Sequence, residues 1–134
     1  AAWFGLLPTS PVQAAEPSDS GWVEMSYISG WGPCPSTRTC FDRWTVERAS
    51  RMLRRTGAQG ALNRQLSVQE MAQLDTWVAR ARQHAIDCPP SPTDVSDSLD
   101  IGYRHAPRFS QDVTGCAHSP DANPVKELRA WLSR

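Results

Sequence analysis

The residues best suited to recognition chemistry lie in one short segment, residues 34–40, with the sequence CPSTRTC. A disulfide between its two cysteines would close a loop and order it before a partner binds, so little conformational entropy would be lost on docking. Arg38 on an extended backbone is what a substrate-like serine-peptidase inhibitor needs, because an acidic specificity pocket receives the cation. The alternative is a cross-linked hairpin tip with a solvated arginine. Pro35, Thr37 and Arg38 are therefore candidate binding residues.

Tryptophan supplies a second kind of candidate contact. The chain has six tryptophans, of which three fall within residues 22–47. An exposed indole can stack on a sugar or anchor a protein partner, although core packing is the alternative for most of them. Trp44 is in phase with the inward residues of an expected strand, whereas Trp31 stands between two glycines in a loop. Trp31 is therefore the tryptophan that we expect at the surface.

Metal ligation is a weaker possibility for this chain. Cys88, Cys116 and His118, with one cysteine of residues 34–40, could supply four zinc ligands. However, the sequence has no CxxC pair, and the thiols of an exported protein would oxidise. We therefore predict no metal and no cofactor.

Catalytic motifs are missing from the sequence. It has no GxSxG elbow, HExxH helix, phosphate-binding loop or dinucleotide fingerprint, and its three histidines stand apart from any recognisable partner. The acids Asp94, Asp97 and Asp100 lack the rest of an EF-hand, and we interpret them as solvated acids of a loop. We predict that the protein is not an enzyme.

The four cysteines allow three disulfide pairings. We favour Cys34–Cys40 with Cys88–Cys116, which closes the first hairpin and fastens a proline-rich loop to the second. A crossed pairing of Cys34 or Cys40 with Cys116 stays open. An even number of cysteines suits an oxidising, exported location.

The first fifteen residues, AAWFGLLPTSPVQAA, have the pattern of the end of a signal peptide: an apolar run, a proline break and small residues before a cleavage point. The alternative is an apolar arm packed on the domain. The run is too short to span a membrane. We predict an exported protein, periplasmic or extracellular, with residues 16–21 as a flexible lead-in and residues 22–134 as a single domain.

Charge is balanced overall, with fourteen basic and fourteen acidic residues, which gives no field for nucleic acid or an anionic membrane. The distribution is uneven, because residues 38–64 carry seven arginines against two acids. Such a stretch is either a solvated face or a surface that holds a partner.

Alternation of apolar and polar residues predicts a hairpin over residues 22–47. Apolar side chains occupy every second position in residues 23–27 and again in 44–46, and the connection between them is rich in Gly and Pro. Residues 51–55 and 61–66 are candidates for two further short strands.

Two helices are predicted after this hairpin. Ser67 and Glu70 have the spacing of a capping box, and apolar residues recur at helical spacing behind them as far as Ala85. Asn123 and Pro124 form an N-cap and first helical residue for a short second helix.

A second hairpin is predicted between the helices. Residues 88–94 form an extended proline-rich connector, residues 99–104 and 109–113 are the two strands, and residues 114–116 end the hairpin. The order β-β-α-β-β-α predicts an α+β fold in which an antiparallel sheet from two hairpins carries two helices on one face, stabilised by disulfides.

This order, the Cys-Pro pair at residues 34–35 and the Gly-Cys pair at residues 115–116 resemble small exported bacterial domains of uncharacterised function. The layout over residues 22–133 is also similar to emfourin-type proteinaceous inhibitors of metallopeptidases. The resemblance is one of architecture: no emfourin binding motif is matched, and the cysteines are a departure. It implies a binding protein rather than a catalyst.

We therefore expect a non-enzymatic binding domain with a protein partner, in the form of a peptidase inhibitor that uses residues 30–40. The alternative is an accessory structural subunit of an envelope or secreted complex, held through its basic residues 38–64 or its tryptophans.

Overall fold

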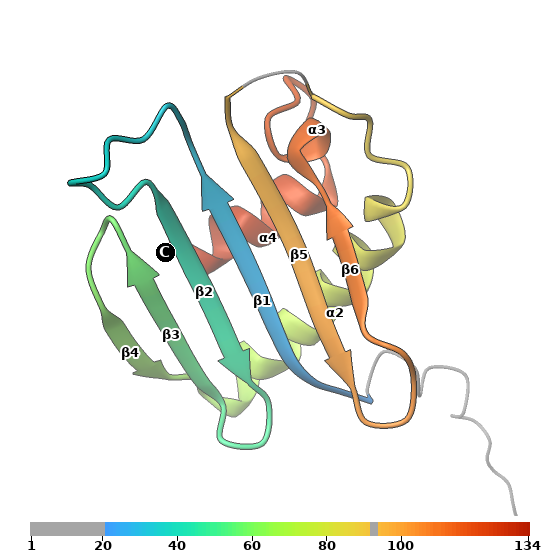
Figure 1. The fold of residues 1–134 in the computed structure, drawn as a ribbon. Coiled ribbons are helices and arrows are strands. Elements are labelled where there is room, and N and C mark those ends of the chain that lie inside the picture. Colours follow the sequence, from blue (N-terminus) through green and yellow to red (C-terminus); the bar gives the residue numbers. More distant parts are fainter. Residues whose placement is uncertain (1–20, 92–93) are drawn as a thin grey trace, which may run out of the picture.

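The computed structural model describes residues 21–91 and 94–134, so the predicted signal segment, residues 1–15, lies outside the described part. The described residues form a six-stranded antiparallel sheet in the order β4-β3-β2-β1-β5-β6, with helices on one face (Figure 1). The elements are β1 (Trp22–Gly30), β2 (Phe41–Glu47), β3 (Met52–Gly57), β4 (Leu62–Gln65), α2 (Val68–Ala85), β5 (Ser96–Tyr103), β6 (Phe109–Asp112), α3 (Thr114–Ala117) and α4 (Pro124–Leu132).

The α+β class with an antiparallel sheet is confirmed, but the predicted order β-β-α-β-β-α is incomplete. Four strands precede α2, because both candidate short strands belong to the sheet as β3 and β4. Residues 114–116 also differ from the prediction, since they lie in the short helix α3. Asp112 causes this difference: its carboxylate accepts hydrogen bonds from the backbone N–H and the hydroxyl of Thr114, which turns the chain into a helix.

The core lies between the sheet and the helices. Met25 and Tyr27 of β1 and Trp44 and Val46 of β2 point inward, as their alternation predicts. The buried residues of α2 recur at the helical spacing that the sequence predicts: Met71, Leu74, Val78, Ala81 and Ala85. The opposite face of the sheet carries no helix in the described structure (Figure 1).

Local capping fixes where the helices begin. The Ser67 hydroxyl accepts from the Glu70 N–H at 3.0 Å, and the Glu70 carboxylate accepts from the Ser67 N–H at 2.9 Å, so the predicted capping box is confirmed. The Asn123 side chain accepts from two N–H groups at the start of α4, which confirms that N-cap.

The two disulfides have the local pairing that the sequence analysis favours. Cys34–Cys40 closes the connection between β1 and β2, and Cys88–Cys116 ties the segment after α2 to α3. Both bonds are consistent with an oxidising, exported location. Within the described residues, none of the helices has the length and apolarity needed to span a membrane.

Gly57, at the end of β3, combines a left-handed backbone with a close backbone approach that excludes a side chain. Its φ is +125°, and a Cβ there would stand 2.1 Å from the Phe41 carbonyl oxygen. Gly57→Ala should lower the free energy of unfolding by about 3 kcal/mol, since strain and a clash with backbone combine. Gly60→Ala is the control, because φ is +88° but no atom lies within 4 Å, and about 1 kcal/mol is expected. Equal losses in urea denaturation would contradict the steric explanation.

Glu70 makes stability depend on pH. The Ser67 backbone N–H, followed by the Arg64 guanidinium 2.7 Å away, lowers the pKa of its carboxyl below the usual value. A depressed folded-state pKa contributes stability above the unfolded-state pKa and loses it as the pH falls through the folded-state pKa. Glu70→Gln should therefore destabilise the protein at pH 7 and much less at pH 3, in urea denaturation at both pH values. An unchanged difference between the two pH values would exclude an ionic contribution.

Candidate functional site

The hairpin tip, residues 30–41, contains the longest connection between two paired strands of the described sheet. Residues 33–39 are all exposed, and the connection extends away from the sheet beyond β1 and β2 (Figure 1). At its base the Trp31 N–H donates to the Cys40 carbonyl at 3.0 Å, and the Cys34–Cys40 disulfide follows directly. The tip is therefore ordered by a hydrogen bond and a covalent cross-link of its own.

The tip also contains an internal turn. The Arg38 N–H donates to the Pro35 carbonyl at 3.1 Å, which closes a turn through Ser36 and Thr37. The segment before Arg38 therefore lacks the extended backbone that a substrate-like inhibitor needs, because this hydrogen bond folds the segment back on itself.

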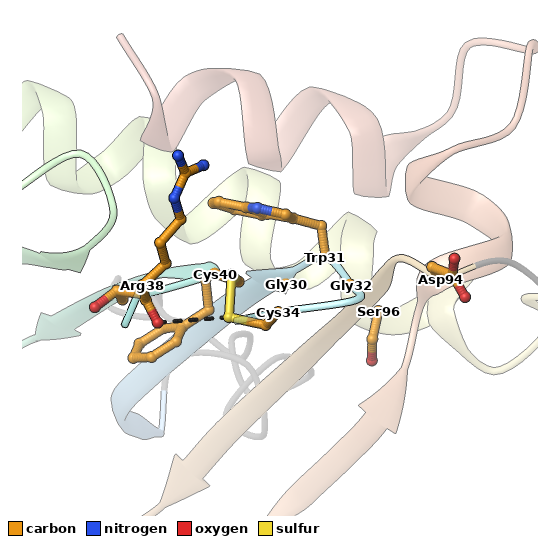
Figure 2. Close-up of a pocket in the computed structure, with 10 residues that line it drawn as sticks. Gly30, Trp31, Gly32, Cys34, Arg38, Cys40, Asp94 and Ser96 are labelled. Atoms are coloured by element: carbon orange, nitrogen blue, oxygen red, sulfur yellow. Dashed lines mark hydrogen bonds between the residues drawn. A yellow bond between two sulfur atoms is a disulfide. The ribbon is translucent and has the colours of Figure 1, made fainter. Parts of the chain in front are cut away.

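An open hollow of about 480 Å³ lies at the base of the tip (Figure 2). Gly30 of β1 pairs with Phe41 of β2 on one side and with Ser96 of β5 on the other. Because Gly30 has no side chain, a gap remains between Phe41 and Ser96 on the face of the sheet without helices. Asp94 lines the hollow on the side of β5. The hollow is wide enough for a side chain of a partner but encloses nothing on its own.

Two of the four predicted binding residues come together. Figure 2 shows the indole of Trp31 and the side chain of Arg38 on the same side of the tip, next to the Cys34–Cys40 disulfide, and both residues line the hollow. Trp31 is 42% exposed, as expected. Pro35 and Thr37 are exposed at the far end of the tip, and neither lines the hollow.

Phe41 is a candidate contact that the sequence reasoning missed. Its side chain is 39% exposed and lines the hollow. The alternation of β2 could have revealed it, because Phe41 shares its parity with the exposed residues Arg43 and Glu47, while Trp44 and Val46 point inward.

The seven arginines of residues 38–64 fall into two groups. Four make side-chain bonds within the described chain, and their acceptors are neighbours in the fold: Arg48 to Asp75, Arg51 to Leu66, Arg55 to Gln59 and Arg64 to Glu70. Among the residues described, the side chains of the other three, Arg38, Arg43 and Arg54, make no hydrogen bond or ion pair. These three cations lie at the tip and on the uncovered face of β2 and β3.

A buried polar cluster centred on Asp97 lies next to the hollow, because Ser29 and Asp97 are the chain neighbours of the lining residues Gly30 and Ser96. Its carboxylate is fully buried and accepts from the Tyr27 hydroxyl at 2.5 Å and the Ser29 hydroxyl at 2.9 Å. His118 Nε2 lies 3.1 Å from the same carboxylate and Arg129 Nε lies 3.5 Å from it. The interpretation of Asp97 as a solvated loop acid is wrong, and so is the isolation of His118.

The parity of β5 could have revealed this cluster. Asp97 has the same parity as Leu99 and Ile101, which are both buried, so the inward face of the strand begins two residues earlier than predicted. A carboxylate at such a position is sequestered from water only if the fold supplies donors from elsewhere in the chain.

The hydrogen bonds of the cluster indicate a structural role and not a catalytic one. Ser29 and His118 both contact the same oxygen of Asp97, so the serine is not hydrogen-bonded to the histidine as a nucleophile is to its base. Burial, and then the Asp97 carboxylate, raises the pKa of Tyr27, which keeps its hydroxyl protonated as a donor. The cluster thus joins β1, β5, α4 and the residue after α3.

No group of three or more metal-ligating side chains converges among the described residues. Cys88 and Cys116, the cysteines weighed as zinc ligands with His118, are bonded to each other.

Comparisons with protein-family models, with curated proteins and with solved structures find no significant match to this chain. The resemblance to the emfourin layout therefore gains no support, and any function has to be argued from the geometry of the tip.

Asp97→Ala should lower the free energy of unfolding by about 3–5 kcal/mol, because the substitution leaves the buried donors of the cluster without their acceptor. Asp94→Ala is the control, since Asp94 is exposed three residues away, and a change within about 0.5 kcal/mol is expected. Chemical denaturation of both variants measures the difference. Similar small losses would mean that the cluster contributes little to the fold.

Proposed function

We propose that this protein is an exported, non-enzymatic binding domain that docks on a protein partner through its hairpin tip. The observation that carries the proposal is that Trp31, which is 42% exposed, lies beside Arg38 on a tip closed by a disulfide, and that the Arg38 side chain has no partner among the described residues.

The residue types at the tip are those that dominate protein–protein binding energies. Tryptophan and arginine are enriched among the few residues whose truncation costs most of the affinity. An exposed indole gives up hydrophobic stabilisation in the free protein, and burial against a partner recovers it. Phe41, which also lines the hollow, adds a second exposed aromatic ring.

The tip also has a low entropic cost of docking. The Cys34–Cys40 disulfide and the hydrogen bonds of Trp31 and Arg38 hold the backbone in one arrangement before binding. A peptidase is one kind of partner for such a tip. The turn through Ser36 and Thr37 favours insertion of a folded tip over a substrate-like extended strand.

A second candidate function is that of an accessory subunit of an envelope or secreted complex. Arg43 pairs with Thr56, and Arg54 lies two residues from Thr56 on the same strand, so the two cations are diagonal neighbours on the uncovered face. An acidic surface of another subunit would bind to Arg43 and Arg54 rather than to the hairpin tip.

Substitutions that leave the fold intact separate the two proposals. Tagged protein is purified from the exported fraction of its source cells, and the amount of its stoichiometric partner is measured. Trp31→Ala should reduce the recovered partner by about tenfold or more. Val68→Ala and Ile86→Ala are matched controls, because these side chains are 70% and 68% exposed but lie at the ends of α2.

Gly30→Ala tests the hollow itself. The added methyl group would meet its nearest neighbours at 3.5–3.8 Å, which is ordinary contact, so the fold should persist while the hollow is partly filled. Partner recovery should fall with Gly30→Ala as well. Recovery that survives Trp31→Ala and Gly30→Ala but is lost when Arg43 and Arg54 are both changed to Glu would contradict docking through the tip and favour the accessory subunit.

A further inference from the structure

We infer that the partner is a glycoside hydrolase, and that Arg38 enters its active-site cleft between the catalytic carboxylates. This inference rests on the proposed function and names the chemical class of the partner. It is carried by the shape of the tip, by its charge and by the turn within it.

The shape of the tip favours a concave partner. Residues 33–39 are exposed without interruption, and the disulfide that closes them joins cysteines only six positions apart. A narrow projection of this kind has little area to offer a flat surface. Inserted into a cleft, the same projection is contacted from both sides, and its aromatic and cationic side chains lose their water.

The charge of the tip favours an acidic cleft. The side chain of Arg38 is cationic and has no ion-pair partner within the described chain. Asp42, the nearest acid along the chain, is buried and accepts from the backbone N–H and side chain of Gln59. The Arg38 guanidinium is therefore free to donate to carboxylates of a partner, where charge-assisted bonds are strongest once water is excluded.

The turn decides between two kinds of acidic cleft. A trypsin-like peptidase receives arginine at the end of a deep pocket from a substrate-like extended backbone, which the Arg38–Pro35 hydrogen bond does not provide. Glycoside hydrolases instead place two carboxyl groups about 5–9.5 Å apart on either side of an open cleft. A planar guanidinium has five N–H donors directed outward in a fork, so one arginine can donate to both carboxylates.

Trp31 completes the fit to such a cleft. Its indole lies on the same side of the tip as the Arg38 side chain (Figure 2). A sugar-binding cleft is built to pack against flat rings, and an indole can occupy that surface as a sugar ring does. The tip would then block the cleft as a competitive inhibitor.

Enzyme inhibition provides the test. The intact protein is assayed against a retaining lysozyme and an inverting cellulase, with trypsin as the peptidase arm. Competitive inhibition of at least one of the two glycoside hydrolases is expected. Arg38→Ala should weaken that inhibition by about 100-fold and Arg38→Lys by about tenfold, because lysine lacks the planar fork. Arg104→Ala is the matched control, since its exposed side chain also lacks a partner in the described structure and lies at the other end of β1, and no change is expected.

Three results would overturn the inference: inhibition of neither glycoside hydrolase, inhibition that Arg38→Ala leaves unchanged, or inhibition of trypsin alone. Thermal denaturation of each variant checks that the fold is retained, which is expected because the side chain of Arg38 makes no bond in the described chain. If Trp31→Ala still abolishes partner recovery while neither hydrolase is inhibited, this inference fails and the proposed function stands. If neither effect is found, both fail.

Discussion

One buried carboxylate, that of Asp97, holds together the parts of the fold that meet beneath the hairpin tip. Burying a charge is costly unless donors surround it, and here the donors come from β1, from α4 and from the residue after α3. Ser29 and Asp97 are the chain neighbours of Gly30 and Ser96, which pair with each other and line the hollow. The cluster therefore fixes the distance between β1 and β5 at the point where the tip leaves the sheet.

The backbone of the hairpin tip is ordered because it continues from β1 and β2 at this point. The hydrogen bond from Trp31 to Cys40 continues the pairing of β1 with β2 past the end of the strands, and the Cys34–Cys40 disulfide closes the segment beyond it. An aromatic and a cationic side chain are thus held outward on a backbone that has few alternatives. A binding surface built in this way loses little entropy on docking, which is why exposure of Trp31 supports function more strongly than exposure of a side chain on a mobile chain would.

Local chemistry made much of the fold predictable. The capping box at Ser67 and Glu70 and the N-cap at Asn123 depend on neighbours within a few residues, and both were confirmed. The strands β3 and β4 carried a poor signal, because Leu53 is the only fully buried apolar residue that they contribute. The parity of β5 places Asp97 on the inward face, but its hydrogen-bond partners could not be identified from the sequence, because they lie far away in the chain. For the same reason the sequence could not show which arginines have no partner among the described residues.

Amide hydrogen exchange of the tip, followed by NMR on the oxidised protein, tests most directly whether the tip is ordered before it binds. The Trp31 and Arg38 amides, which donate to Cys40 and Pro35, should exchange about tenfold or more slowly than the same amides in an unstructured peptide. Thr37 should exchange fast, because its amide has no backbone acceptor in the described structure. Exchange of all three amides at unstructured rates would contradict the account, since the exposed indole and guanidinium would then lie on a disordered loop.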